Sequence, residues 1–466
     1  MFWLFRQVSA SVKAAPCLRL SRPFPILHTK QSDFLRQRCY STSSQPAEYQ
    51  LIEDVESLWE YRPGGYHPTH IDDCLNSRYQ IVHKLGHGAF STAWLAIDKT
   101  TSRYIAVKIG IADADHTEIE TLSRIHKSIA GRNDRQDSLI APIWDFFHHR
   151  GPNGTHPCLV TLPALCSLRD AKEASDNGLL QLEAARSLAA QLVMAVAQFH
   201  SSGYAHGDLH LGNLLLKLPE SLDRMPINKL YEQYGEPNRE PVVRLDDPTA
   251  PKDPGIPSYV VPPVWLGVSS DDVTPEIAKL LLTDFGVAFR PDEASRFKSN
   301  APITIRPPEA FLEPTKPLTF GSDIWSLGCV IFELFAHRTL IDGYFLPTQD
   351  YITAQQVQLQ GPMPLEWWRA WDERSEWYDE AGRSLSPESS LWPWERRFDQ
   401  WVQDPRLREG MELVSKNEME ALLVLLKWML AWKPSQRPDI TQVLAADWMT
   451  MWALPAYQSR GGRDDH

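Results

Sequence analysis

The segment HGDLHLGNLLL (206–216) contains an aspartate and an asparagine five residues apart, directly before an apolar run. Asp208 can orient an incoming hydroxyl group and receive its proton late in a transfer, and Asn213 supplies a neutral oxygen suited to Mg²⁺. The apolar run from Leu214 to Leu216 predicts a buried strand that carries this loop. The spacing indicates phosphoryl transfer, and it specifies the chemistry better than the acceptor.

Two further segments carry residues suited to the same chemistry. In LLLTDFGVAF, Asp284 follows a predicted buried strand, a good position for a hard oxygen ligand to Mg²⁺. Lys108 ends the apolar strand IAVK, and burying its ammonium group is costly unless it meets an anion. Phosphate oxygens would serve, as would the carboxylate of Glu118 in the next predicted helix. A solvated helix face is the alternative for Glu118.

A glycine-containing turn precedes the lysine strand. The segment LGHGAFSTAWLA (85–96) has Gly86 and Gly88 between two strand-like runs. Glycines let the backbone fold closely over phosphates and direct N–H groups at anionic oxygens, although such patterns are also common in simple hairpin turns. In this order, the four residues that could carry chemistry predict a site for ATP and Mg²⁺: Lys108, Asp208, Asn213 and Asp284.

The elements that must position these residues fall into two groups. Short β-rich runs and one helix come first, and the second half is mostly helical, which predicts an α+β architecture of two lobes with a cleft between them. The expected strands are 79–85, 92–98, 103–109, 139–146 and 158–162, and the expected helices are 118–129 and 181–201, the latter ending before Gly203.

Two segments interrupt this plan. Residues 218–279 are rich in proline, aspartate and glycine, which predicts a surface insertion that is partly disordered. Residues 345–410 hold seven tryptophans among many charges, which favours a helical insertion packed on the large lobe. A stacking site for a sugar or a base is the alternative.

Composition excludes several classes of protein. The net charge of −12 argues against a general nucleic-acid binder and leaves room for basic partners. The six cysteines are scattered without a CxxC pair, which favours a reducing compartment. No apolar run reaches the length of a membrane span. We expect a monomer that neither binds nucleic acid directly nor spans a membrane.

The first 44 residues differ from the rest. They hold seven basic residues against one acid, Asp33, with many serines, and they resemble a mitochondrial transit peptide. A disordered basic leader and a misplaced start codon are the alternatives. We therefore separate a leader (1–44) and an N-terminal extension (45–78) from the folded part, with a polar tail at 456–466.

The order of the motifs resembles that of eukaryotic protein kinases. The glycine loop, strand lysine, helix glutamate, catalytic loop, DFG, RPPEAF and GSDIWSLGCVIFEL follow one another between residues 79 and 445. The glycine loop together with GPNGTHPCLV (151–160), and the long insert before DFG, are most similar to the SR-protein kinases, particularly short fungal relatives. The resemblance implies a two-lobed kinase fold, with an N-lobe at 79–165 and a C-lobe at 166–455.

The resemblance also implies site residues and a substrate. It implies ATP-dependent transfer to protein serine or threonine in Arg/Ser-rich segments, in the cytoplasm or nucleus, with the leader pointing to mitochondria as the alternative. The acids Asp372, Glu373, Glu376, Asp379 and Glu380 lie where the family's docking groove is partly built, or form a solvated acidic helix. Around the nucleotide it implies Leu85, Gly86, Gly88, Ser91, Ala93, Ala106, Lys108, Glu118, Thr161 and Leu215; elsewhere it implies a pair between Glu309 and Arg437, and Asp323 beneath the catalytic loop.

Three positions depart from the usual kinase pattern. Ser91 stands where the third loop glycine is common, which is also the SR-protein-kinase pattern. Gly207 replaces an arginine that binds a phosphorylated activation loop, so we expect activity without that phosphorylation. His210 replaces a lysine, a fixed positive charge near the transferring group, and predicts slow turnover. HGDLHLGN also resembles small-molecule and UbiB-type kinases, which leaves these, or a nucleotide-binding scaffold without transfer, as alternatives.

Overall fold

The computed structural model describes residues 49–114, 117–129, 138–249, 252–343, 347–386 and 391–459. The predicted leader at 1–44 therefore lies outside the described residues. So do residues 460–466, which make up most of the predicted tail. Among the described helices, none combines the length and apolar character needed to cross a membrane.

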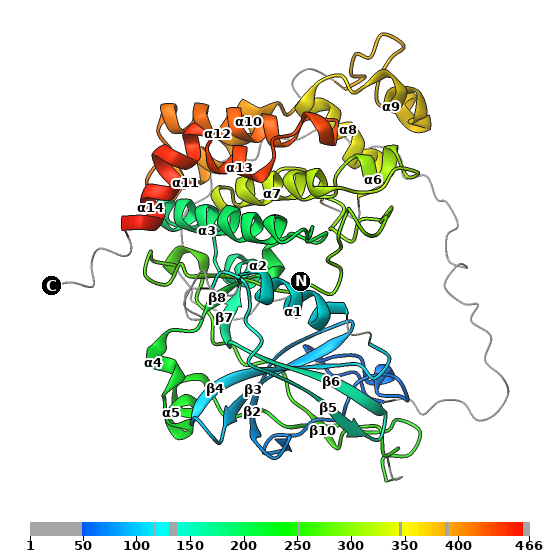
Figure 1. Cartoon of the computed structure of the whole chain (residues 1–466), viewed down its shortest axis with the longest axis vertical. Coiled ribbons are helices and arrows are strands. Elements are labelled where there is room, and N and C mark those ends of the chain that lie inside the picture. The colour runs from blue at the N-terminus through cyan, green and yellow to red at the C-terminus, as the bar shows by residue number, and fades with distance from the viewer. Residues whose placement is uncertain are drawn as a thin grey trace, which may run out of the picture. The chain divides into compact units, whose positions relative to one another are not determined.

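The N-lobe is built on one antiparallel sheet whose strands lie in the order β1-β2-β3-β4-β6-β5 (Figure 1). Alternating apolar residues of this sheet form a buried cluster that includes Ile81, Trp94, Val107 and Val160. Helix α1 (Thr117–Ile129) lies between β4 and β5 in the chain and is the helix of this lobe that carries Glu118. The strands are β1 (Cys74–Leu75), β2 (Tyr79–Gly88), β3 (Ser91–Asp98), β4 (Arg103–Gly110), β5 (Asp145–Gly151) and β6 (Gly154–Thr161).

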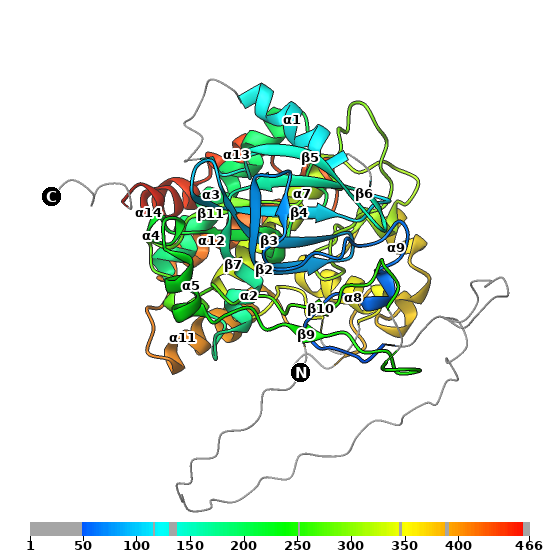
Figure 2. The same ribbon diagram turned by 90° about the horizontal axis from the view of Figure 1, so that it is seen from below.

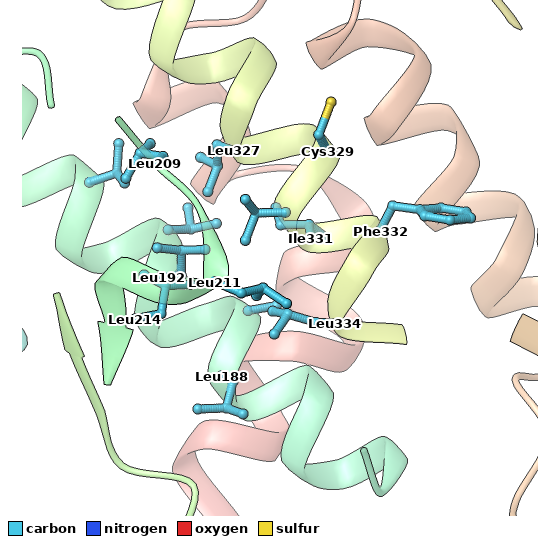
Figure 3. Packing of buried hydrophobic residues seen from close by; sticks show 14 of the residues in the cluster. Leu188, Leu192, Leu209, Leu211, Leu214, Leu327, Cys329, Ile331, Phe332 and Leu334 are labelled. Carbon is cyan, nitrogen blue, oxygen red and sulfur yellow. The ribbon is translucent and has the colours of Figure 1, made fainter. Parts of the chain in front are cut away.

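The C-lobe is helical, and its core lies around α3 (Leu182–Ser201) and α7 (Phe320–Phe335). Figure 3 shows leucines of the catalytic loop packed with Leu188 and Leu192 of α3 and with Leu327 and Ile331 of α7. As predicted, α3 ends before Gly203, which adopts a positive φ of 84° that glycine tolerates best. The other helices of this lobe are α2 (Leu168–Glu173), α6 (Glu309–Leu312), α12 (Lys416–Met429), α13 (Ile440–Leu444) and α14 (Leu454–Ser459).

A small sheet carries the predicted catalytic segments. Its strands lie in the order β11-β8-β7, and they are β7 (Ala164–Ser167), β8 (Leu214–Lys217) and β11 (Leu280–Leu282). Register pairs Leu214 with Leu282, so the residues just before β8 and just after β11 emerge at one edge. The predicted strand at 214–216 and the predicted buried strand before Asp284 are both confirmed.

One predicted strand is wrong. Residues 139–146 were expected to form a strand, but β5 begins only at Asp145 and runs to Gly151. Pro142 lies in the middle of the expected run and has no N–H group to donate to a sheet. Ile140 makes only an isolated bridge to Leu282, which ties this segment to the small sheet instead.

Residues 218–279 were predicted to be a surface insertion that is partly disordered, and the structure describes all of this segment except 250–251. It contains α4 (Glu220–Asp223), α5 (Ile227–Tyr234), β9 (Glu240–Pro241) and β10 (Tyr259–Val260). Leu230 packs with Val82 and Leu95 of the N-lobe sheet. Figure 2 shows β9 and β10 on the opposite side of this sheet from α1. Apolar residues spaced among the prolines provide the buried contacts that composition alone did not reveal.

The N-terminal extension joins the insertion on the N-lobe. Leu58 and Tyr61 form a cluster with Val242 and Val260 of the insertion. Glu56 is buried and pairs with the ammonium group of Lys84 in β2, and the Tyr61 hydroxyl donates to the same carboxylate. A buried carboxylate requires such partners, so the extension is fixed to the strand that leads into the glycine turn.

The tryptophan-rich segment is helical, as predicted. Trp367 and Trp371 are almost fully buried in a cluster with Tyr378, and the Trp371 indole donates to Asp350 at 2.8 Å. These contacts support a packing role over a stacking site for those two rings. Its helices are α8 (Gln349–Gln360), α9 (Leu365–Ala370), α10 (Trp394–Phe398) and α11 (Asp404–Arg408).

The expected pair between Glu309 and Arg437 is present and buried, with nitrogen–oxygen distances of 2.9 and 2.7 Å. We expect Arg437→Met to lower the free energy of unfolding by about 3–5 kcal/mol, because Glu309 would keep a buried charge without its partner. Urea denaturation measures this loss. The matched control is Lys427→Met, which removes an exposed pair with Glu395 and should change stability by less than about 0.5 kcal/mol. Equal effects of the two changes would contradict the assigned role.

Candidate active site

The catalytic loop is held from below by Asp323 of α7. Its carboxylate accepts hydrogen bonds from the backbone N–H groups of His206 at 2.6 Å and Gly207 at 2.9 Å, and it lies 3.0 Å from Nε2 of His200. Burial raises the pKa of Asp323, but these partners lower it by more, so the net pKa lies below its usual value. The carboxylate is therefore charged at neutral pH, and it fixes the loop as the resemblance implied.

Asp208 is oriented by this loop. Its backbone N–H donates to Nδ1 of His206 at 3.3 Å, and Nε2 of that ring lies 3.1 Å from the carbonyl oxygen of Thr283. A neutral His206 with its proton on Nε2 satisfies both contacts, and burial lowers its pKa in agreement. Oδ1 of Asp208 is buried and accepts no hydrogen bond within the described chain. An unpaired buried carboxylate oxygen is suited to receiving the hydrogen of a substrate hydroxyl group.

Asn213 connects Asp208 to the segment that carries Asp284. Its Nδ2 donates to the carbonyl oxygen of Asp208 at 2.9 Å. The backbone carbonyl oxygen of Asn213 accepts hydrogen bonds from the backbone N–H and the hydroxyl of Thr283, at 3.0 and 3.1 Å. The amide nitrogen is thus used within the loop, and the side-chain oxygen is the atom suited to a metal ion.

Asp284 meets Lys108 of the N-lobe. Lys108 Nζ lies 2.8 and 2.9 Å from the two carboxylate oxygens of Glu118 and 3.5 Å from Oδ1 of Asp284. Burial lowers the pKa of Lys108, but the two carboxylates raise it by more; burial raises the pKa of Asp284, but Lys108 and His206 lower it by more. Lys108 and Asp284 therefore both favour their charged forms. Asp284 has a positive φ of 62°, a strained conformation that costs of order 1 kcal/mol and is concentrated at functional sites.

These contacts bring together all four predicted catalytic residues. Lys108 reaches Asp284, the neighbouring Thr283 binds Asn213, and Asn213 binds Asp208. Strands β4, β8 and β11 supply the positions: Lys108 lies within β4, the loop that carries Asp208 and Asn213 leads directly into β8, and Asp284 closely follows β11. The roles of the residues in catalysis stay predictions, while their convergence is a property of the fold.

The glycine turn is open above its backbone. A Cβ atom added at Gly86 or Gly88 would meet nothing within 4 Å, so the described chain leaves room there for a ligand. Ser91 begins β3 and pairs with Gly88. The hydroxyl of Tyr66, in the extension, donates to the carbonyl oxygen of Gly88 at 2.6 Å. Sequence analysis missed this contact, because a tyrosine before the first long strand gives no signal of its partner.

Four of the residues implied for the adenine group lie on neighbouring strands of the N-lobe sheet, and Leu215 lies on β8 of the small sheet. Ala93 pairs with Lys108, Ala106 pairs with Thr161, and Leu215 pairs with Ser167 in the small sheet. The Thr161 hydroxyl donates to the backbone carbonyl oxygen of Pro142 at 2.7 Å. Leu85 packs against the cluster that joins β2 to the insertion.

Two of the unusual positions have a structural explanation. Gly207 adopts a positive φ of 78°, and a Cβ atom there would lie 3.3 Å from Phe289 and from the Val287 carbonyl oxygen. The local backbone therefore favours glycine at position 207. This reason is independent of the loss of the arginine charge. Nδ1 of His210 lies 2.9 Å from the Arg169 guanidinium, a contact that sequence analysis missed.

The described residues fit a metal ion bound together with phosphates. No group of three or more His, Cys, Asp or Glu side chains suited to a metal occurs in the described part of the chain. Asp284 and Asn213 supply two oxygen ligands, and Mg²⁺ commonly binds to one or two protein ligands plus substrate phosphates. The protein alone therefore offers part of a coordination shell, and nucleotide phosphates would supply more of it.

The fold and this arrangement define a protein kinase domain. Residues 79–224 and 272–449 match the family model of the protein kinase domain, and the chain belongs to that family. A solved structure described as the kinase domain of PF14_0431 covers 82% of this chain and 98% of its own, with a TM-score of 0.54 at 17% identity, which supports the fold.

Within that family the chain is a serine/threonine protein kinase that is similar to SR-protein kinases. It is 27% identical to the serine/threonine-protein kinase SRPK of Physarum polycephalum, over 84% of this chain and 91% of the relative. It is 26% identical to a serine/threonine protein kinase of Aspergillus fumigatus, over 85% and 90%. The kinase SKY1 of Saccharomyces cerevisiae is 33% identical over 35% of this chain and 23% of its own length.

Asp323 gives a pH-dependent prediction. Because its pKa is lowered in the folded state, its carboxylate stabilises the fold above its unfolded pKa of about 3.9, and this contribution is lost as pH falls through the lower folded value. We expect Asp323→Asn to cost roughly 2 kcal/mol at neutral pH and progressively less below about pH 4. Urea denaturation of both proteins across this range measures the gap. A gap that stays constant with pH would contradict the charged role.

Proposed function

We propose that this kinase uses ATP and Mg²⁺ to phosphorylate serine residues in Arg/Ser-rich protein segments. The observation that carries the proposal is the continuous chain of contacts from Lys108 through Asp284 and Asn213 to Asp208. Similarity to SR-protein kinases supports the substrate class.

Each residue would have a distinct task in the transfer. Lys108, held by Glu118, would bind the α- and β-phosphates, and the N–H groups of the glycine turn would cover them. Asn213 and Asp284 would hold Mg²⁺, which neutralises charge on the phosphates when bound. Asp208 would orient the serine hydroxyl through its unpaired oxygen and accept the proton late in the transfer. Positioning and charge neutralisation supply most of the rate.

The acidic segment supports a basic substrate. Asp372, Glu373, Glu376 and Glu380 are exposed, so their charges face solvent. Asp379 differs, because it pairs with Arg383 at 2.8 Å. Exposed carboxylates close in sequence would attract an arginine-rich peptide and raise its rate of association, an effect that salt weakens.

A transfer assay tests the activity and the substrate class. The folded part from residue 45 onward is incubated with labelled ATP and an Arg/Ser peptide, a generic basic protein, or choline-like alcohols. We expect transfer to the peptide, with loss of at least roughly 10³-fold in Asp208→Asn, because the acceptor for the hydroxyl proton is removed.

The controls distinguish the alternatives. Nucleotide binding in Asp208→Asn should persist, since that residue does not hold the phosphates. Preferential transfer to the alcohols would contradict the protein substrate, and binding without any transfer would contradict the enzyme. Glu373→Gln with Glu376→Gln should raise KM for the Arg/Ser peptide, since these carboxylates would attract its arginines.

We propose a cytoplasmic or nuclear localisation, on the basis of the resemblance to SR-protein kinases. The basic leader at 1–44 supports mitochondrial import as the alternative. Fluorescent fusions of the full chain and of a chain lacking 1–44 test this proposal. Identical cytoplasmic or nuclear patterns are expected, and mitochondrial signal that depends on the leader would overturn it.

A further inference from the structure

His210 lies in the catalytic loop between two buried leucines. Leu209 and Leu211 are 1% and 3% exposed and pack into the core between α3 and α7 (Figure 3). Since the backbone of His210 is extended, its side chain lies on the side away from these leucines. Its Nε2 lies 3.6 Å from Oδ2 of Asp208, which is too long for a direct hydrogen bond.

The other ring nitrogen receives two hydrogen bonds. Nδ1 of His210 accepts from the backbone N–H of Gly212 at 3.0 Å and from the Arg169 guanidinium at 2.9 Å. Both groups are donors only, because a backbone N–H and a guanidinium cannot accept. Nδ1 therefore carries no proton, and the proton of the neutral imidazole is on Nε2, near Asp208.

Gly212 allows this arrangement. A Cβ atom at position 212 would lie 2.8 Å from Cε1 and 2.9 Å from Nδ1 of His210, and 3.0 Å from Cζ of Arg169. Any side chain there would push the two groups apart. The absence of a side chain at position 212 therefore leaves room for the contact between His210 and Arg169.

Charges around the pair leave Arg169 positive. Among the described residues Arg169 forms no salt bridge, and its neighbour Asp170 is used in the N-terminal cap of α2, where it binds Ser167. Besides Asp208, Glu333 of α7 is an acid that interacts electrostatically with the pair; burial raises its pKa, and Lys172, Arg169 and His210 lower it by less. Lys172 binds the carbonyl oxygens of Glu333 and Ala336. The guanidinium charge is therefore not cancelled by a contacting carboxylate.

We infer that Arg169 and His210 together replace the lysine that most protein kinases carry at position 210. Arg169 is a positioning residue that supplies the fixed positive charge and sets the tautomer, and His210 presents its Nε2–H beside Asp208. That N–H is free to donate to an oxygen of the transferring phosphoryl group, and His210 neither gains nor loses a proton. The inference rests on the proposed role of Asp208.

Substitution of Arg169 tests this pair. We expect Arg169→Met to lower kcat on the order of tenfold at about pH 8, less than the roughly 10²-fold loss typical of removing a directly contacting donor. KM for ATP should stay within about twofold, because Arg169 acts through His210 and not on the nucleotide. The loss should shrink toward about pH 6, since an imidazole without the guanidinium cation beside it can take up a proton and carry the charge itself.

A second substitution provides the rescue. His210→Lys in the Arg169→Met background should restore kcat to within about threefold at all pH values, since the lysine charge no longer depends on Arg169. Gly212→Ala keeps both side chains, His210 and Arg169, but separates them, and we expect it to reproduce the loss. Lys416→Met, which removes an exposed charge of α12, is the matched control and should leave kcat unchanged.

The outcomes separate the possible failures. A raised KM for ATP without rescue by lysine would show that Arg169 binds nucleotide, and would overturn the inference. An equal loss at all pH values without rescue, together with a lowered thermal midpoint, would show a structural role and would also overturn it. Absence of transfer in the unmodified protein would instead contradict the proposed function. Normal activity of Gly212→Ala would show that the contact is dispensable.

Discussion

The buried carboxylate of Asp323 is the interaction on which the rest of the site depends. Its negative charge would be costly in the core, and it is retained because two backbone N–H groups and His200 surround it. Those N–H groups belong to His206 and Gly207, so the first residues of the catalytic loop are fixed to α7. His206 then passes this order to Asp208 and to the carbonyl of Thr283. Through His206, the buried charge of Asp323 therefore helps to position Asp208 and the segment that carries Asp284.

Other buried charges connect the site to parts of the chain that are distant in sequence. Glu309 and Arg437 join the segment after DFG to the last helices, and Arg437 also donates to the carbonyl oxygens of Gly321, Ala431 and Trp432. Glu56 and Lys84 similarly join the extension to the strand before the glycine turn. Breaking such a pair leaves a buried charge, so these contacts specify one arrangement more than they add stability.

Sequence patterns predicted the parts of this structure that depend on local signals. The strands around the glycine turn, the long helix ending before Gly203 and the strands beside the catalytic residues all follow from apolar periodicity and turn residues. Pro142 was overlooked as a strand breaker, so one strand was placed too early. The buried contacts of Leu230, and that of Tyr66 with Gly88, depend on pairing between distant segments, which no single-sequence pattern reports. Arg169 was missed for the same reason, although Gly212 beside His210 was a usable signal.

The histidine at position 210, which departs from the usual kinase pattern, is explained by its contacts with Gly212 and Arg169. Slow turnover was expected because a histidine near neutral pH carries only part of the charge of a lysine. In the folded chain, however, both groups that contact Nδ1 of this imidazole are donors, which places its N–H at Nε2, beside Asp208. The positive charge is then carried by Arg169, which contacts His210 on the side away from Asp208. The charge of a guanidinium does not vary with pH in the physiological range. The loop therefore lacks the usual lysine at position 210, and the guanidinium of Arg169 provides a permanent positive charge near Asp208, the proposed catalytic aspartate.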